Sequence, residues 1–398
     1  METKNIGLRN IEVADTKICA IDGVNGKLIY RGYDILDLVK KSNFEETACL
    51  LLNDDLPTDK TLEDFGTKLM QARDIPENIE KNLKNLPKTA NPMDVIQSRI
   101  SELAVYDKEK GDDHKTNYNR AIDLISKIPI IIAYWDRIRN GKEVVLPSKK
   151  LGHAGNFLYM LTGKEPDPEI ARIFDICLIL HAEHSFNAST FAAREVASTR
   201  AHMYAAVSAA IGALSGELHG GANFQVMKML LDIQTEDKVE SKIKEKLAKG
   251  DRIMGMGHAV YKTFDPRAEV LRELSRRLSE KTGQPWYRIT KRVEEVTEEE
   301  MKKVKGSDIF PNVDLYSAST YYMLGIPMDL NTPIFAISRT AGWTAHIIEE
   351  KFAEAQPKPM LYRPKAVYVG KYCGPSGCEY LPIEKRQTPS LTGKLKID

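Results

Sequence analysis

Residues 187–215 read NASTFAAREVASTRAHMYAAVSAAIGALS, and this stretch is the most informative about the fold. It is rich in alanine and serine, whose small side chains let packed helices approach one another closely. Two interpretations stay open. The stretch is either a central helix of a large all-α core or a helix at a tight subunit interface.

Helical patterns also dominate on both sides of this stretch. Apolar residues recur there at three- to four-residue spacing, which is typical of helices that bury one face. The expected helices before it are 33–41, 44–52, 61–72, 94–105 and 120–139, and those after it are 224–249, 267–281, 293–305, 316–323 and 333–352.

Short apolar runs near both ends predict small β-hairpins. Runs 18–21 and 28–30 flank the turn-forming residues 22–26. Runs 366–369 and 380–383 predict a second hairpin around a loop that contains Cys373 and Cys378. The expected fold class is therefore mostly α, with small β-hairpins near both termini.

Length and charge exclude several classes of protein. A chain of 398 residues is long enough for two or three domains and for a large core without metal or disulfide staples. Its formal net charge of +1 gives no reason to propose a nucleic-acid or membrane partner. Residues 1–17 have no signal-peptide layout, and the densest apolar runs, 128–135 and 173–180, fall short of the ~20 residues that span a bilayer. We expect a cytoplasmic protein.

The cysteines agree with a reducing compartment. There are five of them, an odd and sparse set, and most are expected to be small core residues. Cys373 and Cys378 stand four residues apart in a Gly/Pro loop without a second pair, so they do not indicate a zinc site. A redox-labile local bridge is the alternative.

Two histidines lie close together in segment 178–187. His181 and His184 are three residues apart, so both would share one helix face. A metal site, a core histidine bonded to the backbone, and an anion-binding histidine at a helix end are all open interpretations. The metal site is the weakest, because no other close cluster of ligand residues supports it.

A third histidine, His219, precedes two glycines. It follows a long apolar helix, at a place where glycine lets the backbone approach a ligand. His and Gly are also favoured at an ordinary helix C-terminus, so this segment alone does not establish function.

The loop 255–267, GMGHAVYKTFDPR, combines glycines with His258, Lys262 and Arg267. A Gly-x-Gly pattern alone is a weak signal, but the basic residues that follow it make an anionic ligand more credible. Asp265 and Pro266 predict a helix start with Asp as its cap. Arg267 would then lie in the first turn, where a cation is disfavoured, and an acidic ligand would explain it.

Two further segments carry polar residues beside apolar helices. Asp314 stands just before an apolar run and is a good N-cap. Arg339 lies within an otherwise apolar helical stretch, so it needs a carboxylate partner from the protein or from a substrate.

Taken together, these segments resemble the citrate synthase family, and its shorter bacterial and archaeal branch more than the mitochondrial one. The similarity runs from the Asp22 turn to Arg386. One matching motif would be weak, whereas five in the family's order and spacing are specific. They are GELHGGAN (216–223), GMGHAVYKTFDPRA (255–268), PNVDLYSAS (311–319), SRTAGWTAH (338–346) and RPKAVYVG (363–370).

The resemblance implies a division of catalytic labour. Asp314 would remove a proton from the acetyl methyl of acetyl-CoA, and His219 would stabilise the resulting enol. His258 would polarise the ketone of oxaloacetate, and water would then cleave the citryl thioester. The chemistry requires such a pair, because a thioester α-proton is too weakly acidic unless the enolate is stabilised as it forms.

The resemblance also implies the binding residues. His184 would hold oxaloacetate, and Arg267 and Arg339 would clamp its carboxylates. Arg363 would reach the site from the other subunit of an obligate homodimer. No metal and no cofactor beyond the CoA thioester substrate are expected, because cationic Arg and His can polarise the ketone.

CoA would bind along the glycine loop, and a domain would close over it. The loop contacts implied by the resemblance are Gly255, Gly257, Ala259 and Lys262, and Lys305 is a further candidate. Both lysines have an alternative as solvated surface charges. Because the condensation needs a dry site, a small domain, 221–324, is expected to close over a discontinuous large helical domain, 1–220 and 325–398.

Several alternatives remain. A 2-methylcitrate synthase uses propionyl-CoA with the same residues, and one methylene changes binding by only ~1–3 kcal/mol. Citrate cleavage is the reverse reaction. A metal-dependent lyase or hydrolase would use His181 and His184, and a non-enzymatic CoA-binding protein would bind without turnover. Ser185 stands where several relatives carry an acidic residue, which leaves the pocket shape open.

Overall fold

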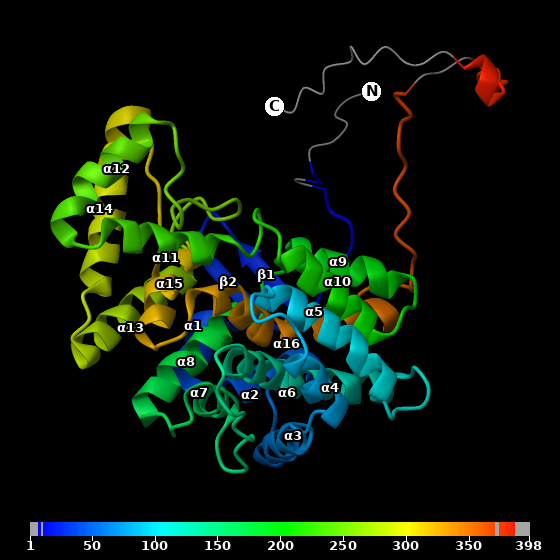
Figure 1. Cartoon of the computed structure of the whole chain (residues 1–398), viewed down its shortest axis with the longest axis horizontal. Coiled ribbons are helices and arrows are strands. Elements are labelled where there is room, and N and C mark those ends of the chain that lie inside the picture. Colours follow the sequence, from blue (N-terminus) through cyan, green and yellow to red (C-terminus); the bar gives the residue numbers. More distant parts are fainter. Residues whose placement is uncertain (1–6, 9–10, 371–373, 387–398) are drawn as a thin grey trace. The chain divides into compact units, whose positions relative to one another are not determined.

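The computed structural model describes residues 7–8, 11–370 and 374–386, without the side chain of Lys305. The chain forms two units, Met1–Leu361 and Tyr362–Asp398. The first eight helices are α1 (Ile35–Lys41), α2 (Phe44–Asn53), α3 (Asp59–Gln71), α4 (Glu77–Lys84), α5 (Pro92–Leu103), α6 (His114–Arg139), α7 (His153–Thr162) and α8 (Pro168–His181) (Figure 1).

The later helices complete the first unit and confirm a mostly helical fold. They are α9 (Ala188–Ser198), α10 (Met203–Leu214), α11 (Ala222–Ile233), α12 (Val239–Ala248), α13 (Pro266–Thr282), α14 (Trp286–Lys305), α15 (Val313–Met323) and α16 (Asn331–Phe352). Short 3-10 turns are η1 (Ala104–Tyr106), η2 (Glu236–Lys238), η3 (Met328–Leu330) and, in the second unit, η4 (Ile383–Lys385).

The predicted N-terminal hairpin is confirmed. Strands β1 (Cys19–Asp22), β2 (Lys27–Tyr30) and β3 (Tyr33–Asp34) form an antiparallel sheet in that order, with Cys19 opposite Tyr30. The β1–β2 turn packs tightly on a distant loop, because a Cβ added at Gly23 would lie 2.4 Å from the carbonyl oxygen of Val260. The sheet therefore supports the loop that carries His258.

The predicted C-terminal hairpin is wrong for the residues that the structure describes. Segments 362–370 and 374–386 contain no strand. Val367 and Val369 are 58% and 86% exposed, so these apolar residues are not packed in a core that could support a hairpin, and an isolated hairpin is marginal in water. Cys378 is disulfide-bonded, whereas Cys373 lies outside the described residues.

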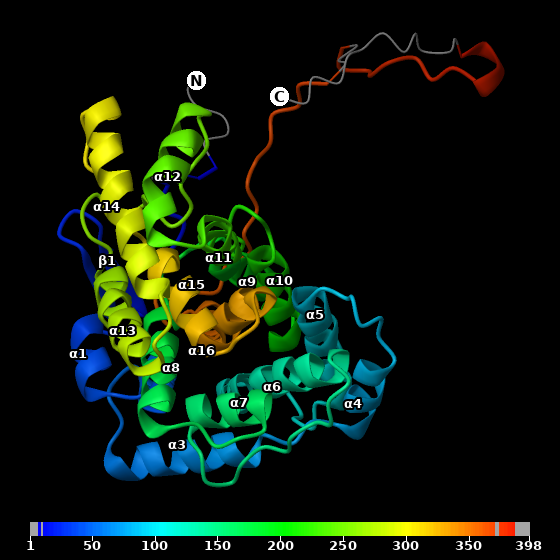
Figure 2. The same ribbon diagram turned by 60° about the vertical axis from the view of Figure 1, so that its left-hand side comes forward.

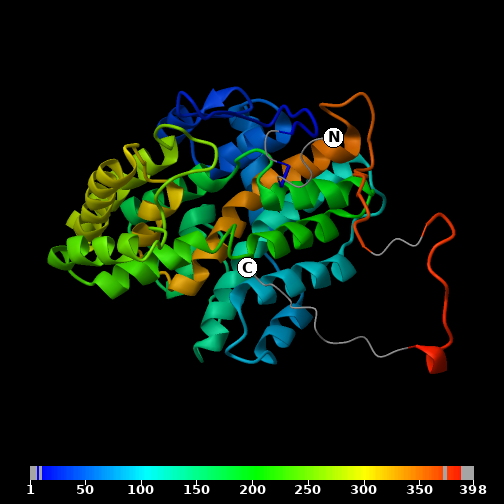
Figure 3. The same cartoon turned by 90° about the horizontal axis from the view of Figure 1, so that it is seen from above.

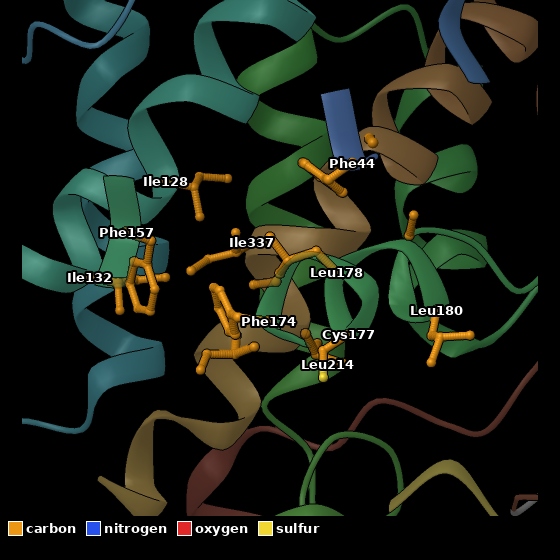
Figure 4. Close-up of a cluster of buried hydrophobic side chains, with 14 of the residues drawn as sticks. Phe44, Ile128, Ile132, Phe157, Phe174, Cys177, Leu178, Leu180, Leu214 and Ile337 are labelled. Atoms are coloured by element: carbon orange, nitrogen blue, oxygen red, sulfur yellow. The ribbon is translucent and has the colours of Figure 1, made fainter. Parts of the chain in front are cut away.

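The core is built around α16, which is buried on all sides. It packs on α2, α6, α8, α9 and α10, and a helix surrounded in this way belongs to the centre of a large core. Figure 4 shows Ile337 of α16 among Phe174 and Leu178 of α8 and Ile128 of α6. Cys19, Cys49 and Cys177 are free and buried, as expected of small core residues.

The alanine-rich stretch forms two helices, so the single helix expected over 187–215 is wrong. The chain turns at 199–202, and the His202 side chain accepts from the backbone N–H of Ala205 to cap α10. Close approach is confirmed: a Cβ at Gly212 would lie 2.6 Å from Nε2 of Gln97 in α5. The inward faces of α9 and α10 belong to the core, and the subunit interface stays a prediction.

Helices α11 to α15 pack on one another. Figures 1 and 2 place α12 and α14 away from α3 and α4, and Figure 3 shows the same separation from above. The predicted helix 224–249 is interrupted and appears as α11 and α12. Within the described residues, no helix is long and apolar enough to cross a membrane. The division into domains 1–220 with 325–398 and 221–324 stays a prediction.

Candidate active site

A cavity of about 700 Å³ lies where the predicted motifs meet. Its walls come from the turn after α8, the turn before α11, the loop before α13, the start of α15 and the middle of α16. The predicted site residues that line it are His184, His219, His258, Ala259, Arg267, Asp314 and Arg339. Segments far apart in the sequence are therefore brought to one place, as the motifs predicted.

His258 is held as a neutral imidazole with a defined tautomer. Its Nδ1 accepts from the backbone N–H groups of Val260 at 3.0 Å and Tyr261 at 3.2 Å. Burial, and then the charge of Arg267, lower the pKa of His258 to about 4. The proton of the neutral ring is thus on Nε2, which can donate a hydrogen bond to a ligand oxygen.

His219 is also neutral, but with the opposite tautomer. Its Nε2 accepts from the backbone N–H of Ser189 at 3.2 Å, in the first turn of α9, and lies 2.8 Å from the Ser189 hydroxyl. Burial, and then the charge of Arg339, lower the pKa of His219 to about 4. Its proton is therefore on Nδ1, which has no hydrogen-bond partner among the described residues and can donate to a ligand.

Asp314 is not the cap of its helix, so that prediction is wrong. Asn312 caps α15, because its side chain accepts from the backbone N–H of Asp314 at 2.9 Å. Burial is the main cause that raises the pKa of Asp314 to about 6. A carboxylate with a raised pKa at a cavity wall is a suitable general base near neutral pH.

Arg339 is a buried cation without an ion-pair partner in the described chain. Only 2% of it is exposed, and its Nε donates to the carbonyl oxygen of His181 at 2.7 Å. No carboxylate of the described residues lies within 4.0 Å of its guanidinium. Burial lowers the pKa of Arg339. The sequence predicted that this arginine needs a carboxylate, and the cavity offers room for that of a ligand.

Arg267 has a protein partner that the sequence interpretation did not anticipate. Its Nε and Nη2 donate to the two oxygens of Asp265 at 3.0 and 2.8 Å. Burial opposes the charged form, but this pairing outweighs it and raises the pKa of Arg267. Asp265 also caps α13, as predicted, by accepting from the Arg267 backbone N–H. An acidic ligand is thus not needed to explain Arg267, although Arg267 faces the cavity.

His181 and His184 do not share one helix face, so that expectation is wrong. Helix α8 ends at His181, and His184 lies in the following turn. His181 is a core histidine whose Nδ1 lies 2.6 Å from the carbonyl oxygen of Cys177. His184 lines the cavity, and its Nε2 lies 3.2 Å from the hydroxyl of the buried Tyr261. Burial takes the pKa of His184 well below its usual range. No group of three metal-ligating side chains occurs in the described parts of the chain.

The glycine loop is shaped by contacts within the protein. Gly255 and Gly257 have φ of +84° and +82°, which favour glycine. A Cβ at Gly255 would lie 2.9 Å from Cα of Leu315, and Gly257 N–H donates to the carbonyl oxygen of Phe310 at 2.7 Å. Lys262 is exposed beside a smaller cavity of about 180 Å³. These contacts explain both glycines without a ligand, and CoA binding there stays a prediction.

Gly255, Gly257 and Lys262 do not line this cavity, and two further predicted residues, Lys305 and Arg363, are not placed relative to it. The side chain of Lys305 lies outside the description, and Arg363 belongs to the second unit. Other contributors were missed. Ser189 and Tyr261 lie inside stretches quoted from the sequence. Their backbone N–H groups bond the histidines, and residue type does not indicate such a backbone contact. Tyr30 reaches the turn after α8 from a strand about 150 residues earlier, and nothing in its local sequence indicates this.

Comparisons with known proteins give matches over nearly the whole chain. The family model described as "Citrate synthase, C-terminal domain" matches residues 7–365. A citrate synthase of Haloferax volcanii is 41% identical over 387 residues, covering 96% of this chain and 98% of the relative. A citrate/2-methylcitrate synthase of Bacillus subtilis is 39% identical over 366 residues, covering 92% and 96%.

A solved structure is also similar to this chain in fold. It is the ternary complex of carboxymethyl coenzyme A and oxaloacetate with the citrate synthase of the thermophilic archaeon Thermoplasma acidophilum. That chain is 30% identical, its TM-score is 0.89, and the match covers 97% of this chain and 100% of the other.

Proposed function

Because the chain belongs to the citrate synthase family and is an enzyme with citrate synthase activity, we propose that His219, His258 and Asp314 carry out its chemistry. The reaction joins the methyl carbon of acetyl-CoA to the ketone carbon of oxaloacetate and then hydrolyses the thioester to citrate and CoA. The observation that carries the proposal is a pair of neutral histidines with opposite tautomers beside a carboxyl of raised pKa.

Enolisation is the first step. The Asp314 carboxylate takes a proton from the methyl group, and the electrons of that C–H bond move toward the thioester oxygen. Nδ1–H of His219 donates to this oxygen as negative charge develops on it. A donor fixed before the reaction stabilises the charge without reorganising, which is the usual source of a large rate effect.

Condensation and hydrolysis follow. The enol carbon attacks the ketone carbon and a carbon–carbon bond forms, while the π electrons of the ketone C=O bond move onto its oxygen. This oxygen accepts the hydrogen bond of Nε2–H of His258 and takes up a proton, which balances the one that Asp314 removed and gives the hydroxyl of the citryl thioester. Water then attacks the thioester carbonyl, and CoA leaves as the thiol. Because the intermediates react with water, closure of the predicted small domain over the site would protect them.

Binding of oxaloacetate is assigned to the buried cations. Arg339 lacks a carboxylate partner among the described residues, and the Arg267 guanidinium keeps one nitrogen, Nη1, free of the Asp265 pair. His184 adds a third contact from the turn after α8. In this proposal, Arg363 from the second subunit of a homodimer also binds a carboxylate of oxaloacetate. We also propose that the enzyme is cytoplasmic.

The acyl preference is tested by thiol release from acetyl-CoA and from propionyl-CoA, each with oxaloacetate. We expect a higher kcat/KM with acetyl-CoA and full activity in EDTA. A higher value with propionyl-CoA would favour the 2-methylcitrate reaction, and loss of activity with the chelator would favour a metal-dependent lyase or hydrolase. Absence of thiol release with both substrates would contradict the proposal.

A further inference from the structure

Glu183 is a buried acid directly before His184 that has no role in the proposed chemistry. Its side chain is fully buried, and Oε1 lies 3.0 Å from Nε2 of His346 in α16. Oε2 has no hydrogen-bond partner among the described residues. Burying an incompletely paired carboxylate is costly, so the fold tolerates Glu183 at some expense in stability.

The backbone of Glu183 is held from the N-terminal sheet. The hydroxyl of Tyr30 in β2 donates to the carbonyl oxygen of Glu183 at 2.8 Å and accepts from its backbone N–H at 3.2 Å. Tyr30 is itself fully buried. Removing this hydroxyl would leave the backbone N–H and the carbonyl oxygen of Glu183 unpaired and buried. The carbonyl belongs to the peptide bond that joins Glu183 to His184.

The side chain of Glu183 is held from α16. Nδ1 of His346 lies 3.0 Å from Nη1 of Arg194, and a guanidinium only donates, so Nδ1 is the acceptor. The neutral ring therefore carries its proton on Nε2 and donates it to Glu183. Gly342, one turn earlier in α16, leaves the space, because a Cβ there would lie 2.2 Å from Oε2 of Glu183.

The turn that follows needs such restraint. Ser185 has φ of +51°, a left-handed conformation that is uncommon for residues other than glycine. Strained turns persist only when their surroundings over-determine them, and they are common at ligand sites. The contacts on Glu183 come from two separate elements, β2 and α16, and they meet one residue before His184.

We propose that Tyr30, Glu183 and His346, here called the Glu183 clasp, are positioning residues that set His184 for binding of the 2-oxo dicarboxylate. The inference rests on the proposed role of His184 as an oxaloacetate ligand. The clasp touches neither the acyl group nor the reacting atoms. It therefore acts on oxaloacetate binding and leaves enolisation of the thioester to Asp314 and His219.

The test compares Tyr30→Phe, His346→Ala and His346→Gln with the parent enzyme. Tyr30→Phe and His346→Ala are expected to raise KM for oxaloacetate about tenfold or more, the effect of about 1.4 kcal/mol, with little change in kcat or in KM for acetyl-CoA. His346→Gln is expected to restore most of the affinity, because its amide N–H can take the place of Nε2–H. A merely structural role would not split KM from kcat in this way.

Tyr204→Phe is the matched control. Tyr204 is 2% exposed, and its hydroxyl donates to Asp123 away from the active-site cavity. This variant is expected to lower Tm without moving either KM. An unchanged KM for oxaloacetate in Tyr30→Phe would overturn the clasp, and so would an equal effect in Tyr204→Phe.

His184→Ala separates the clasp from its premise. If this variant leaves KM for oxaloacetate unchanged, the proposed role of His184 fails. If it raises KM whereas Tyr30→Phe does not, the role of His184 stands and the clasp alone is overturned.

Discussion

The backbone N–H of Ser189 lies 3.2 Å from Nε2 of His219, whereas at His258 the backbone donors point at Nδ1. A ring nitrogen that accepts a backbone hydrogen bond cannot carry the proton of a neutral imidazole. The two histidines that we propose as catalytic therefore keep their protons on opposite nitrogens. Residue type alone says nothing about this difference, and the fold decides it.

Amide variants of the two histidines should show opposite preferences. The asparagine amide lies near the place of Nδ1 and the glutamine amide near that of Nε2. We expect His219→Asn to keep more kcat than His219→Gln, and His258→Gln to keep more than His258→Asn. Losing the donor should cost about 10²–10³-fold in kcat at saturating substrates. The same preference at both positions would contradict the assigned tautomers.

Asp314→Asn should remove the base without removing a helix cap. We expect kcat to fall about 10²–10⁴-fold while KM for oxaloacetate stays within about twofold. Asn312→Ala is the matched control, because it removes the actual cap of α15 and should cost about 1 kcal/mol of stability. Normal turnover by Asp314→Asn in a steady-state assay would mean that another group removes the proton.

In Asp314→Asn, stability should rise while activity falls. The carboxyl of Asp314 has a pKa of about 6 in the folded protein and an ordinary value of 3.8 in the unfolded chain. The folded state thus binds this proton more tightly, and the contribution to stability is complete below about pH 3.8 and lost as pH rises through 6. Asp314→Asn should therefore have a higher Tm than the parent at pH 7, measured by thermal unfolding.

The pH profile should report the same carboxyl. Below about pH 6 the base becomes protonated, so kcat/KM should fall about tenfold for each further pH unit. The pKa values of His219 and His258 are about 4, so both rings stay neutral over this range. The residual activity of Asp314→Asn should lack this acid limb. An acid limb centred near pH 4 in the parent would assign the base an ordinary carboxyl pKa and count against the proposal.

Much of the fold followed from periodicity and turn chemistry. The hairpin at β1 and β2, the Asp265 cap and the apolar α16 were all predictable, because each is encoded by neighbouring residues. Helix interruption was harder to predict. The break before α10 comes from the residues around His202, within a run of good helix formers that gives no strong stop signal.

The sequence identified seven of the residues that line the cavity, but not the contacts that they make. The motifs identified Asp314 and Arg267, yet the capping role expected of Asp314 belongs to Asn312, and the carboxylate that pairs with Arg267 is its own helix cap, Asp265. Both errors concern which of two nearby polar groups makes a given bond. Sequence spacing cannot decide that, because the choice depends on side-chain direction and burial.

The two buried arginines should differ in their effect on stability. Arg267→Met leaves the Asp265 carboxylate, 1% exposed, without its partner and should cost about 3–5 kcal/mol. Arg339→Met removes a cation that lacks an ion pair among the described residues, so the loss should be nearer the ~1 kcal/mol of one hydrogen bond to His181. Urea unfolding measures both, and both variants should also raise KM for oxaloacetate.

A double variant tests the physical reason for this difference. If the cost of Arg267→Met comes from the stranded Asp265 charge, then Asp265→Asn in the same chain should recover part of the stability, because it removes that charge while an amide oxygen remains to cap α13. Asp265→Asn combined with Arg339→Met should recover nothing, since Arg339 does not pair with Asp265. Equal losses in the two single arginine variants, or recovery in the second combination, would show that the ion pair is not what separates the two arginines.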